Sequence, residues 1–199
     1  MIPPRVILAS GSAIRRQIML NAGIKFDVIA RPIDEAFIKQ SMLEVCAKPS
    51  DIAAALAEAK AMHVSREEPG LVIGADQIMV MDDKLYDKPA TMAEARERLM
   101  VMRGKVHYLI GAVVICRSRA PVWRHLAKTK LTMRDFSDEF LDEYLENEGE
   151  QILKSVGAYR FEGPGAQLFS SVEGDFFSIL GLSLLPVLDY LRSQGVIAS

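Results

Sequence analysis

Residues 5–22 read RVILASGSAIRRQIMLNA, and this stretch decides the class of fold that the sequence predicts. Its first five residues, Arg5 to Ala9, predict a buried strand. The small residues of Ser10-Gly11-Ser12 predict a tight loop, and the residues after them predict a helix from Ala13 to Ala22 that Gly23 ends. Short apolar runs and helical patterns alternate in the same way along the rest of the chain. This alternation favours a mixed α/β architecture over an all-helical or all-β one.

The remaining elements follow the same reasoning. We expect further strands over residues 25–30, 71–81, 105–116 and 122–133, helices over 50–65, 91–103 and from 137 onward, and a last strand and helix within 166–194. Ser50 is a good N-cap for the alanine-rich helix, and Thr91 with Glu94 forms a capping box. We expect a loop over 31–35 and a turn over 119–121. No linker, repeat or low-complexity tract divides the chain, which indicates a single domain over 1–199.

The composition excludes several classes of protein. The chain has 199 residues, of which 50% are hydrophobic and 25% charged, so it is neither disordered nor a small disulfide scaffold. Its formal charge of −2 provides no global attraction to nucleic acid or to anionic lipid. Two cysteines without metal-ligand spacing, and no leader at the N-terminus, indicate the cytoplasm. No apolar run approaches the ~20 residues of a membrane span.

The loop Ser10-Gly11-Ser12 is the first candidate site. The N-terminus of a helix offers unpaired N–H groups and a partial positive charge, so a loop of small residues before it can bind an anion. Arg15, one turn into the helix, would add a planar and always charged fork for phosphate oxygens. The alternative is a plain turn with a capping serine, because Ser-Gly-Ser occurs in many turns.

Asp76 is the second candidate, because it interrupts the apolar run LVIGADQIMVM at residues 71–81. A buried carboxylate is costly unless it is paired, protonated or bound to a cation. Gly74 and Ala75 directly before it leave room for a ligand or for another backbone. The alternative is a bulge or an edge position where Asp76 faces water.

Four further charged residues would be ordinary surface or loop residues if each stood alone: Glu35, Lys60, Lys88 and Glu162. Their order along the chain and the residues around them are informative when they are considered together. Nine segments of this chain carry motifs that resemble the Maf family: residues 8–16, 33–35, 56–61, 74–76, 87–89, 103–107, 157–159, 172–175 and 181–184. The resemblance extends from about residue 5 to 192.

This resemblance implies a nucleoside triphosphate pyrophosphatase with a house-cleaning role, which cuts between the α and β phosphates. It also implies a fold similar to that of the inosine triphosphate pyrophosphatases. That fold is a mixed, curved sheet flanked by helices, with two lobes and a central cleft. A homodimer is expected. An alternative within the same family is a nucleotide-binding regulator, linked to septum formation, that has lost turnover.

The resemblance also implies roles for individual residues. Ser10, Ser12, Arg15, Lys60 and Lys88 would bind the triphosphate. Glu35 would coordinate Mg²⁺ or Mn²⁺, which prefer carboxylate and water oxygens. Asp76 would be the catalytic aspartate, either as the base that takes a proton from water or as a ligand of the metal. These two roles of Asp76 remain open at the level of sequence.

Base selection is implied by three positions: Ile14, Gln77 and Glu162. All three depart from the pattern of members that prefer dTTP or UTP. Gln77 and Glu162 match the subgroup that hydrolyses 7-methyl-GTP, although that subgroup usually has Trp at the position of Ile14. A carboxylate can accept the two adjacent N–H donors of guanine, whereas it would repel the carbonyls of uracil or thymine. The resemblance therefore predicts a guanine-type substrate, a modified or non-standard nucleotide such as 7-methyl-GTP, with a pyrophosphatase for dTTP or UTP as the alternative.

The three histidines do not predict a metal site. His63, His107 and His125 are far apart in the sequence and form no ligand pair, so no zinc site is expected.

Overall fold

The structure is a computed structural model that describes residues 3–198, and its contacts divide these residues into two compact units. The first unit comprises residues 3–77, 111–127 and 176–198, and the second comprises 78–110 and 128–175. Three long strands, β3 (Leu71–Met81), β5 (Val106–Arg117) and β6 (Ala120–Met133), contribute residues to both units.

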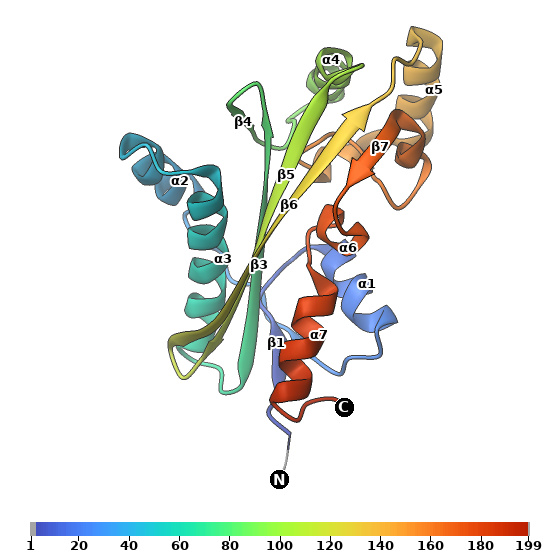
Figure 1. Ribbon diagram of the computed structural model, residues 1–199. Coiled ribbons are helices and arrows are strands. Elements are labelled where there is room, and N and C mark those ends of the chain that lie inside the picture. The colour runs from blue at the N-terminus through green and yellow to red at the C-terminus, as the bar shows by residue number, and fades with distance from the viewer. Residues whose placement is uncertain (1–2, 199) are drawn as a thin grey trace. The chain divides into compact units, whose positions relative to one another are not determined.

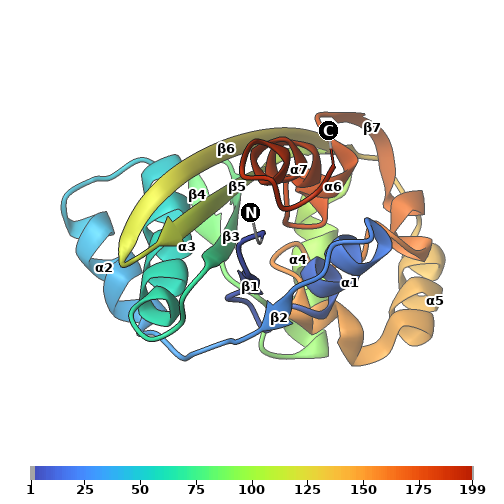
Figure 2. The ribbon, with the colours of Figure 1, turned by 90° about the horizontal axis from the view of Figure 1, so that it is seen from below.

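The first unit contains two more strands and five helices of the described residues: β1 (Val6–Leu8), α1 (Ala13–Asn21), β2 (Asp27–Val28), α2 (Glu35–Glu44), α3 (Pro49–Ser65), α6 (Phe176–Ile179) and α7 (Leu184–Ser193). Its strands β1 and β2 are parallel, and β1 is also parallel to β3, with Val6 opposite Leu71. The helix α3 covers one face of this part of the sheet, while α1 and α7 cover the other (Figure 1, Figure 2). Apolar side chains of α1, β1, β3, β5 and α7 form one buried cluster.

The second unit contains β4 (Lys84–Tyr86), α4 (Met92–Met102), α5 (Asp138–Glu148), two 3₁₀ segments, η1 (Gly149–Lys154) and η2 (Pro164–Leu168), and β7 (Phe169–Glu173). Strand β4 is antiparallel to β3, and β7 is antiparallel to β6. Along the described chain, the strand order is β2-β1-β3-β5-β6-β7, with β4 attached to β3. The predicted mixed α/β sheet flanked by helices is thereby confirmed.

The close packing of α3 on β3 depends on Gly74. A Cβ atom at residue 74 would lie 2.2 Å from the carbonyl oxygen of Ala57 and 2.8 Å from the backbone nitrogen of Ala61. The absence of a side chain therefore lets the helix approach the strand directly. As a result, Lys60 of the helix lies beside the strand residues that follow Gly74.

Most of the expected elements are present, but three expectations are wrong. The helix predicted from Ser50 begins at Pro49, and its N-cap Lys48 makes no side-chain capping bond. The turn expected over 119–121 lies earlier, because Ser118 and Arg119 have positive φ angles and β6 already begins at Ala120. A proline at the first helical position and a hairpin turn with two left-handed residues explain both shifts.

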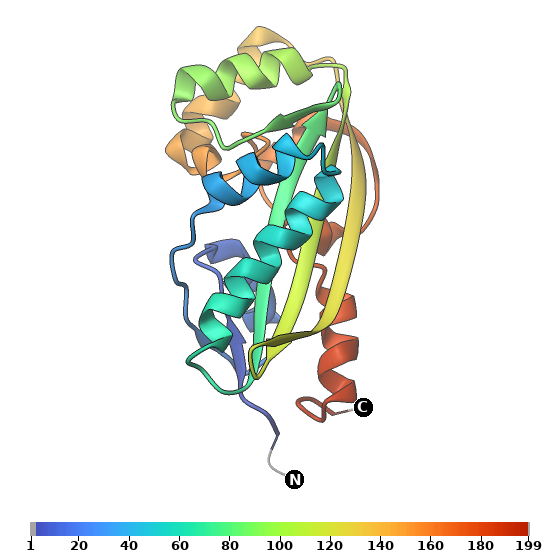
Figure 3. The same cartoon turned by 90° about the vertical axis from the view of Figure 1, so that its left-hand side faces the viewer.

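The third difference is α2, a helix that begins at Glu35, inside the loop expected over 31–35. Glu35 does not end a loop but begins this helix, and the carboxylate of the N-cap Asp34 accepts a hydrogen bond from the backbone N–H of Phe37 at 2.9 Å. The helix has no buried residue among those described, so it shows no apolar stripe that periodicity could detect. Figure 3 shows α2 against the N-terminal end of α3.

No helix within residues 3–198 combines the length and the apolar character that crossing a bilayer requires.

Candidate active site

Asp76 lies inside the first unit, where its residue is 8% exposed. Its carboxylate oxygen Oδ1 accepts a hydrogen bond from the ammonium of Lys60, with 2.6 Å between the two atoms. The alternative of an edge position facing water is therefore wrong. Because the charge of Asp76 is compensated by a cation whose own side chain is only 15% exposed, this carboxylate can remain inside an apolar strand.

The Lys60 ammonium also contacts Glu35, whose Oε1 lies 2.9 Å from Nζ. Glu35 stands in the first turn of α2, held there by the Asp34 cap, and half of its side chain is exposed. The cluster of Lys60, Asp76 and Glu35 thus joins three elements, α3, β3 and α2. One cation between two carboxylates leaves a net charge of −1 on this cluster.

The predicted loop before α1 has the geometry of a capped helix N-terminus. The Ser12 hydroxyl caps the helix by accepting from the backbone N–H of Arg15 at 3.4 Å, and the Ser10 hydroxyl accepts from the backbone N–H of Ser12 at 3.3 Å. The guanidinium of Arg15 lies 3.3 Å from the Ser10 hydroxyl through Nη1. The structure therefore brings Ser10, Ser12 and Arg15 together, as the sequence predicts.

The guanidinium of Arg15 also holds two backbone segments. Its Nε donates to the carbonyl of Gly181 and its Nη1 to the carbonyl of Ala75, both at 2.8 Å. Burial lowers the pKa of this guanidinium, while the negative charges of Asp76 and Glu35 act in the opposite direction. Arg15 consequently positions the backbone directly before Asp76, in addition to any contact with a ligand.

The predicted base-selecting residues of the first unit have structural contacts of their own. Gln77 donates from Nε2 to the backbone carbonyls of Ser178 at 2.7 Å and Ile179 at 3.2 Å, so its amide ties β3 to α6. Ile14 packs against the buried apolar cluster of this unit. Both residues therefore lie beside the elements that carry Asp76 and Arg15.

Lys88 and Glu162, the other predicted residues, belong to the second unit. Lys88 follows β4 in the loop before α4, and Glu162 lies between η1 and η2. The carboxylate of Glu162 accepts from Nε of Arg160 at 3.2 Å.

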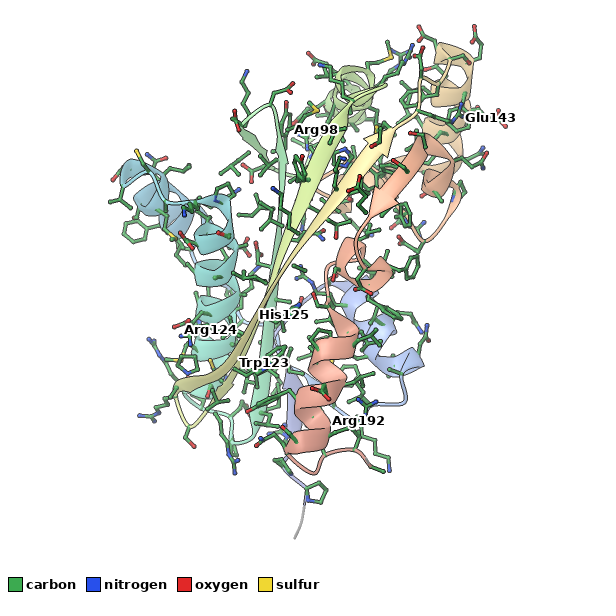
Figure 4. All side chains as sticks on the ribbon, in the orientation of Figure 1. Arg98, Trp123, Arg124, His125, Glu143 and Arg192 are labelled. Carbon is green, nitrogen blue, oxygen red and sulfur yellow. The ribbon has the colours of Figure 1, made fainter. Side chains whose placement is uncertain are left out.

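Arg98 on α4 is a buried residue that the sequence analysis missed (Figure 4). Its Nη1 donates to the carbonyl of Asp87, next to Lys88, and to the carbonyl of Val156 at 2.7 Å, while Nη2 contacts Glu94 at 2.8 Å. One guanidinium thus joins the loop that carries Lys88 to the segment that leads to Glu162. Its place on the apolar face of α4, between Ala95 and Met102, was the signal that could have identified it.

His107 supports the same segment from inside the second unit. Its side chain is fully buried, and its Nε2 lies 2.8 Å from the hydroxyl oxygen of Tyr159. Burial lowers the pKa of this imidazole to about 4, so it is neutral at physiological pH. This environment agrees with a structural histidine.

The donor set at Glu35 and Asp76 fits a hard divalent cation. Both carboxylates already share one positively charged group, the ammonium of Lys60. Mg²⁺ needs only one or two protein carboxylates, because water and phosphate oxygens supply its other ligands. Within the described residues, no group of three or more His, Cys, Asp or Glu side chains forms a complete protein cage for a metal. The arrangement therefore suits an ion that arrives with a phosphate ligand.

Comparison with known proteins identifies relatives along nearly the whole chain. The Maf-like protein family matches residues 5–194. A nucleoside triphosphate pyrophosphatase of Hyphomonas neptunium is 48% identical over 96% of this chain and 97% of its own length. A nucleoside triphosphate pyrophosphatase of Paramagnetospirillum magneticum is 50% identical over 95% of this chain and 98% of its own. A 7-methyl-GTP pyrophosphatase of Rhizobium meliloti is 47% identical over 98% of each chain.

Proposed function

Because the chain belongs to the Maf family, we propose that it is a nucleoside triphosphate pyrophosphatase that releases a nucleoside monophosphate and pyrophosphate. The observation that carries this proposal is the Lys60 ammonium between the carboxylates of Asp76 and Glu35. Catalysis of this reaction depends on positioning and on shielding of the phosphate charges, rather than on a covalent intermediate. The Lys60 ammonium supplies positive charge for this shielding, and the two carboxylates hold it in place and offer oxygen ligands to a divalent cation.

The phosphates would bind at the N-terminus of α1. There the Ser10 and Ser12 hydroxyls and the charge of Arg15 are placed together, which favours an anion. Lys60 on α3 would add a positive charge, and Lys88 is proposed as a further phosphate-binding cation. Because Nε and Nη1 of Arg15 are engaged with backbone carbonyls, its contribution to a phosphate comes from its charge and from its remaining donors.

Asp76 would act on the attacking water. Its carboxylate is an acceptor beside the ammonium of Lys60, so it can take the proton that the water loses as it attacks phosphorus. The alternative role is that of a metal ligand. Both roles require the negative charge of Asp76, and both place the reaction beside Lys60.

Glu35 and Asp76 would hold a Mg²⁺ or Mn²⁺ ion. When bound, such an ion lowers the pKa of its water and neutralises phosphate charge. Lys60 would then share the two carboxylates with the ion, while Glu35, half exposed at the start of α2, can turn toward solvent to meet it.

The base would be a guanine, with 7-methylguanine as the preferred form. Glu162 presents a carboxylate that can accept two adjacent N–H donors, a pattern that guanine has and uracil and thymine lack. Relatives named 7-methyl-GTP pyrophosphatase from two Rhizobium species, at 47% and 44% identity, support this choice.

A nucleotide panel tests the proposal. The purified protein is incubated with Mg²⁺ or Mn²⁺ and with 7-methyl-GTP, GTP, dTTP, UTP, CTP or ATP, and pyrophosphate and monophosphate are measured. We expect metal-dependent release of pyrophosphate, with the highest kcat/KM for the guanine nucleotides. Release of orthophosphate would contradict the reaction, and a preference for dTTP or UTP would contradict the base. Tight binding of a nucleotide without product would favour the regulator instead.

A further inference from the structure

In the second unit, the guanidinium of Arg160 lies between two carboxylates. Its Nε is 3.2 Å from Oε1 of Glu162, and its Nη1 is 3.2 Å from Oε2 of Glu148. Guanidinium donors are arranged in a rigid planar fork, so binding two carboxylates fixes both of them relative to one another. The position of the Glu162 carboxylate therefore depends on that of Glu148.

Glu148 is the anchored member of this set. It is the last residue of α5, and its side chain is only 5% exposed, whereas those of Arg160 and Glu162 are 40% and 25% exposed. A carboxylate buried to this degree requires a partner, and Arg160 supplies the positive charge. The buried Glu148 carboxylate thus holds Arg160 from one side, and Arg160 in turn contacts Glu162.

The backbone of the segment is held on α5 as well. The backbone N–H of Arg160 donates to the hydroxyl of Tyr144 at 3.2 Å. A Cβ atom at Gly165 would lie 2.4 Å from the carbonyl oxygen of Arg160, so the chain folds back tightly on itself beyond Glu162. Together these contacts leave Glu162 on a short, closed segment rather than on a free loop.

From this geometry we infer that Arg160 and Glu148 are positioning residues for base recognition, which hold the Glu162 carboxylate ready to accept the donors of a guanine base. The inference rests on the proposed function, because it names the residues that hold Glu162, and the proposed function gives Glu162 the role of recognising the base. The Arg160 fork occupies Oε1 of Glu162 with one hydrogen bond, and a carboxylate has about four acceptor positions. The remaining positions can therefore serve the base.

The charges of the three residues predict which base benefits most. Arg160 alone would neutralise the charge of Glu162. Glu148 adds a second carboxylate to the set, which returns its net charge to −1. A negative set attracts the cationic 7-methylguanine more strongly than neutral guanine. Removing the charge of Glu148 should therefore reduce the preference for the methylated base, in addition to loosening Glu162.

Four variants test the inference: Glu148→Gln, Arg160→Lys, Glu162→Gln and, as a matched control, Glu143→Gln. Glu143 lies on the same helix as Glu148, is exposed and points away from the unit (Figure 4). For each variant, kcat and KM are measured with 7-methyl-GTP, GTP and UTP, and thermal unfolding reports whether the fold is retained. Arg160→Lys keeps the charge but not the planar fork, so it separates geometry from charge.

We expect Glu148→Gln and Arg160→Lys to raise KM for both guanine nucleotides at least fivefold, and more than they lower kcat. Glu148→Gln should also lower the ratio of kcat/KM for 7-methyl-GTP over GTP at least threefold, which a merely structural defect would not do. Glu143→Gln should have the same kcat and KM as the wild-type protein for all three substrates.

The outcomes separate two kinds of failure. If Glu162→Gln abolishes the guanine preference while Glu148→Gln and Arg160→Lys keep it, the inference is wrong and the proposed base recognition stands. If the wild-type protein shows no guanine preference, the proposed base recognition is wrong, and the inference is overturned with it.

Discussion

The ammonium of Lys60 lies 2.6 Å from the carboxylate of Asp76, although 16 residues separate them in the chain. The contact exists because α3 packs against β3 at Gly74, and the same ammonium reaches Glu35 at 2.9 Å. The acidic group of an apolar strand thus shares one cation with the first residue of a surface helix.

Replacing Asp76 with Asn should lower the rate of pyrophosphate release at least ~100-fold, because an amide can neither accept the proton of water nor bind a metal as a carboxylate does. The fold should persist, since Asn has the same size and Lys60 retains Glu35 as a partner. Asp83→Asn, in the exposed turn after β3, should retain full activity. Substantial hydrolysis by Asp76→Asn would remove this residue from the mechanism.

Glu35→Gln should raise the Mg²⁺ or Mn²⁺ concentration needed for half-maximal activity by about tenfold or more, since one carboxylate ligand is lost. The same shift should be visible in a titration of Mn²⁺ followed by its paramagnetic resonance signal. Glu44→Gln, at the other end of α2, is the control and should behave as the wild-type protein. An unchanged metal requirement in Glu35→Gln would exclude Glu35 as a ligand.

Gly74→Ala should lower the free energy of unfolding by about 1–3 kcal/mol, because the new methyl group collides with backbone atoms of α3. Activity should fall further than stability explains, since α3 must move away and carry Lys60 from Asp76. Gly111→Ala is the matched control, because its nearest neighbour would be the Asp76 carbonyl oxygen at an ordinary 4.0 Å. Chemical denaturation and the pyrophosphate assay measure the two effects; equal losses for both glycines would contradict the packing argument.

Arg98→Met should lower the free energy of unfolding by about 2–4 kcal/mol, because the carbonyls of Asp87 and Val156 lose a charged donor. Arg96→Met on the same helix removes only an exposed ion pair with Asp142 and should cost less than about 1 kcal/mol. Urea denaturation of the two variants measures their free energies of unfolding and tests this difference. Similar stabilities would show that the Arg98 contacts do not hold the two loops.

The burial of His107 predicts a loss of stability in acid. The unfolded chain protonates this imidazole near pH 6.5, whereas the folded protein does so only near pH 4. The contribution of neutral His107 to the free energy of unfolding is therefore complete above pH 6.5. It is lost as the pH falls toward 4, and the loss amounts to about 3 kcal/mol in total. Denaturation curves between pH 4 and 7.5 should show this slope in the wild-type protein and in His63→Gln, but not in His107→Gln. A slope retained in His107→Gln would assign the effect to other groups.

Local sequence determined the elements whose signals lie within a few residues of one another. Strand β3 has the predicted bounds because its apolar residues are continuous, and the helices that Ser12, Thr91 and Ser137 cap begin where predicted because each hydroxyl accepts from a backbone N–H three residues on. The same local reasoning missed α2, whose residues all remain accessible to solvent and so carry no periodic pattern.

For the candidate site, the sequence alone specified which residue types are present and that Asp76 would be costly to bury without a cation. The three-dimensional packing was needed to show that Lys60 is this cation, that two donors of Arg15 bind backbone carbonyls, and that Arg160 joins Glu162 to Glu148. The physical reason is that charge pairing and hydrogen bonding require atoms about 3 Å apart. Residues distant in the chain reach that separation only through the packing of helices and strands, which no local pattern specifies.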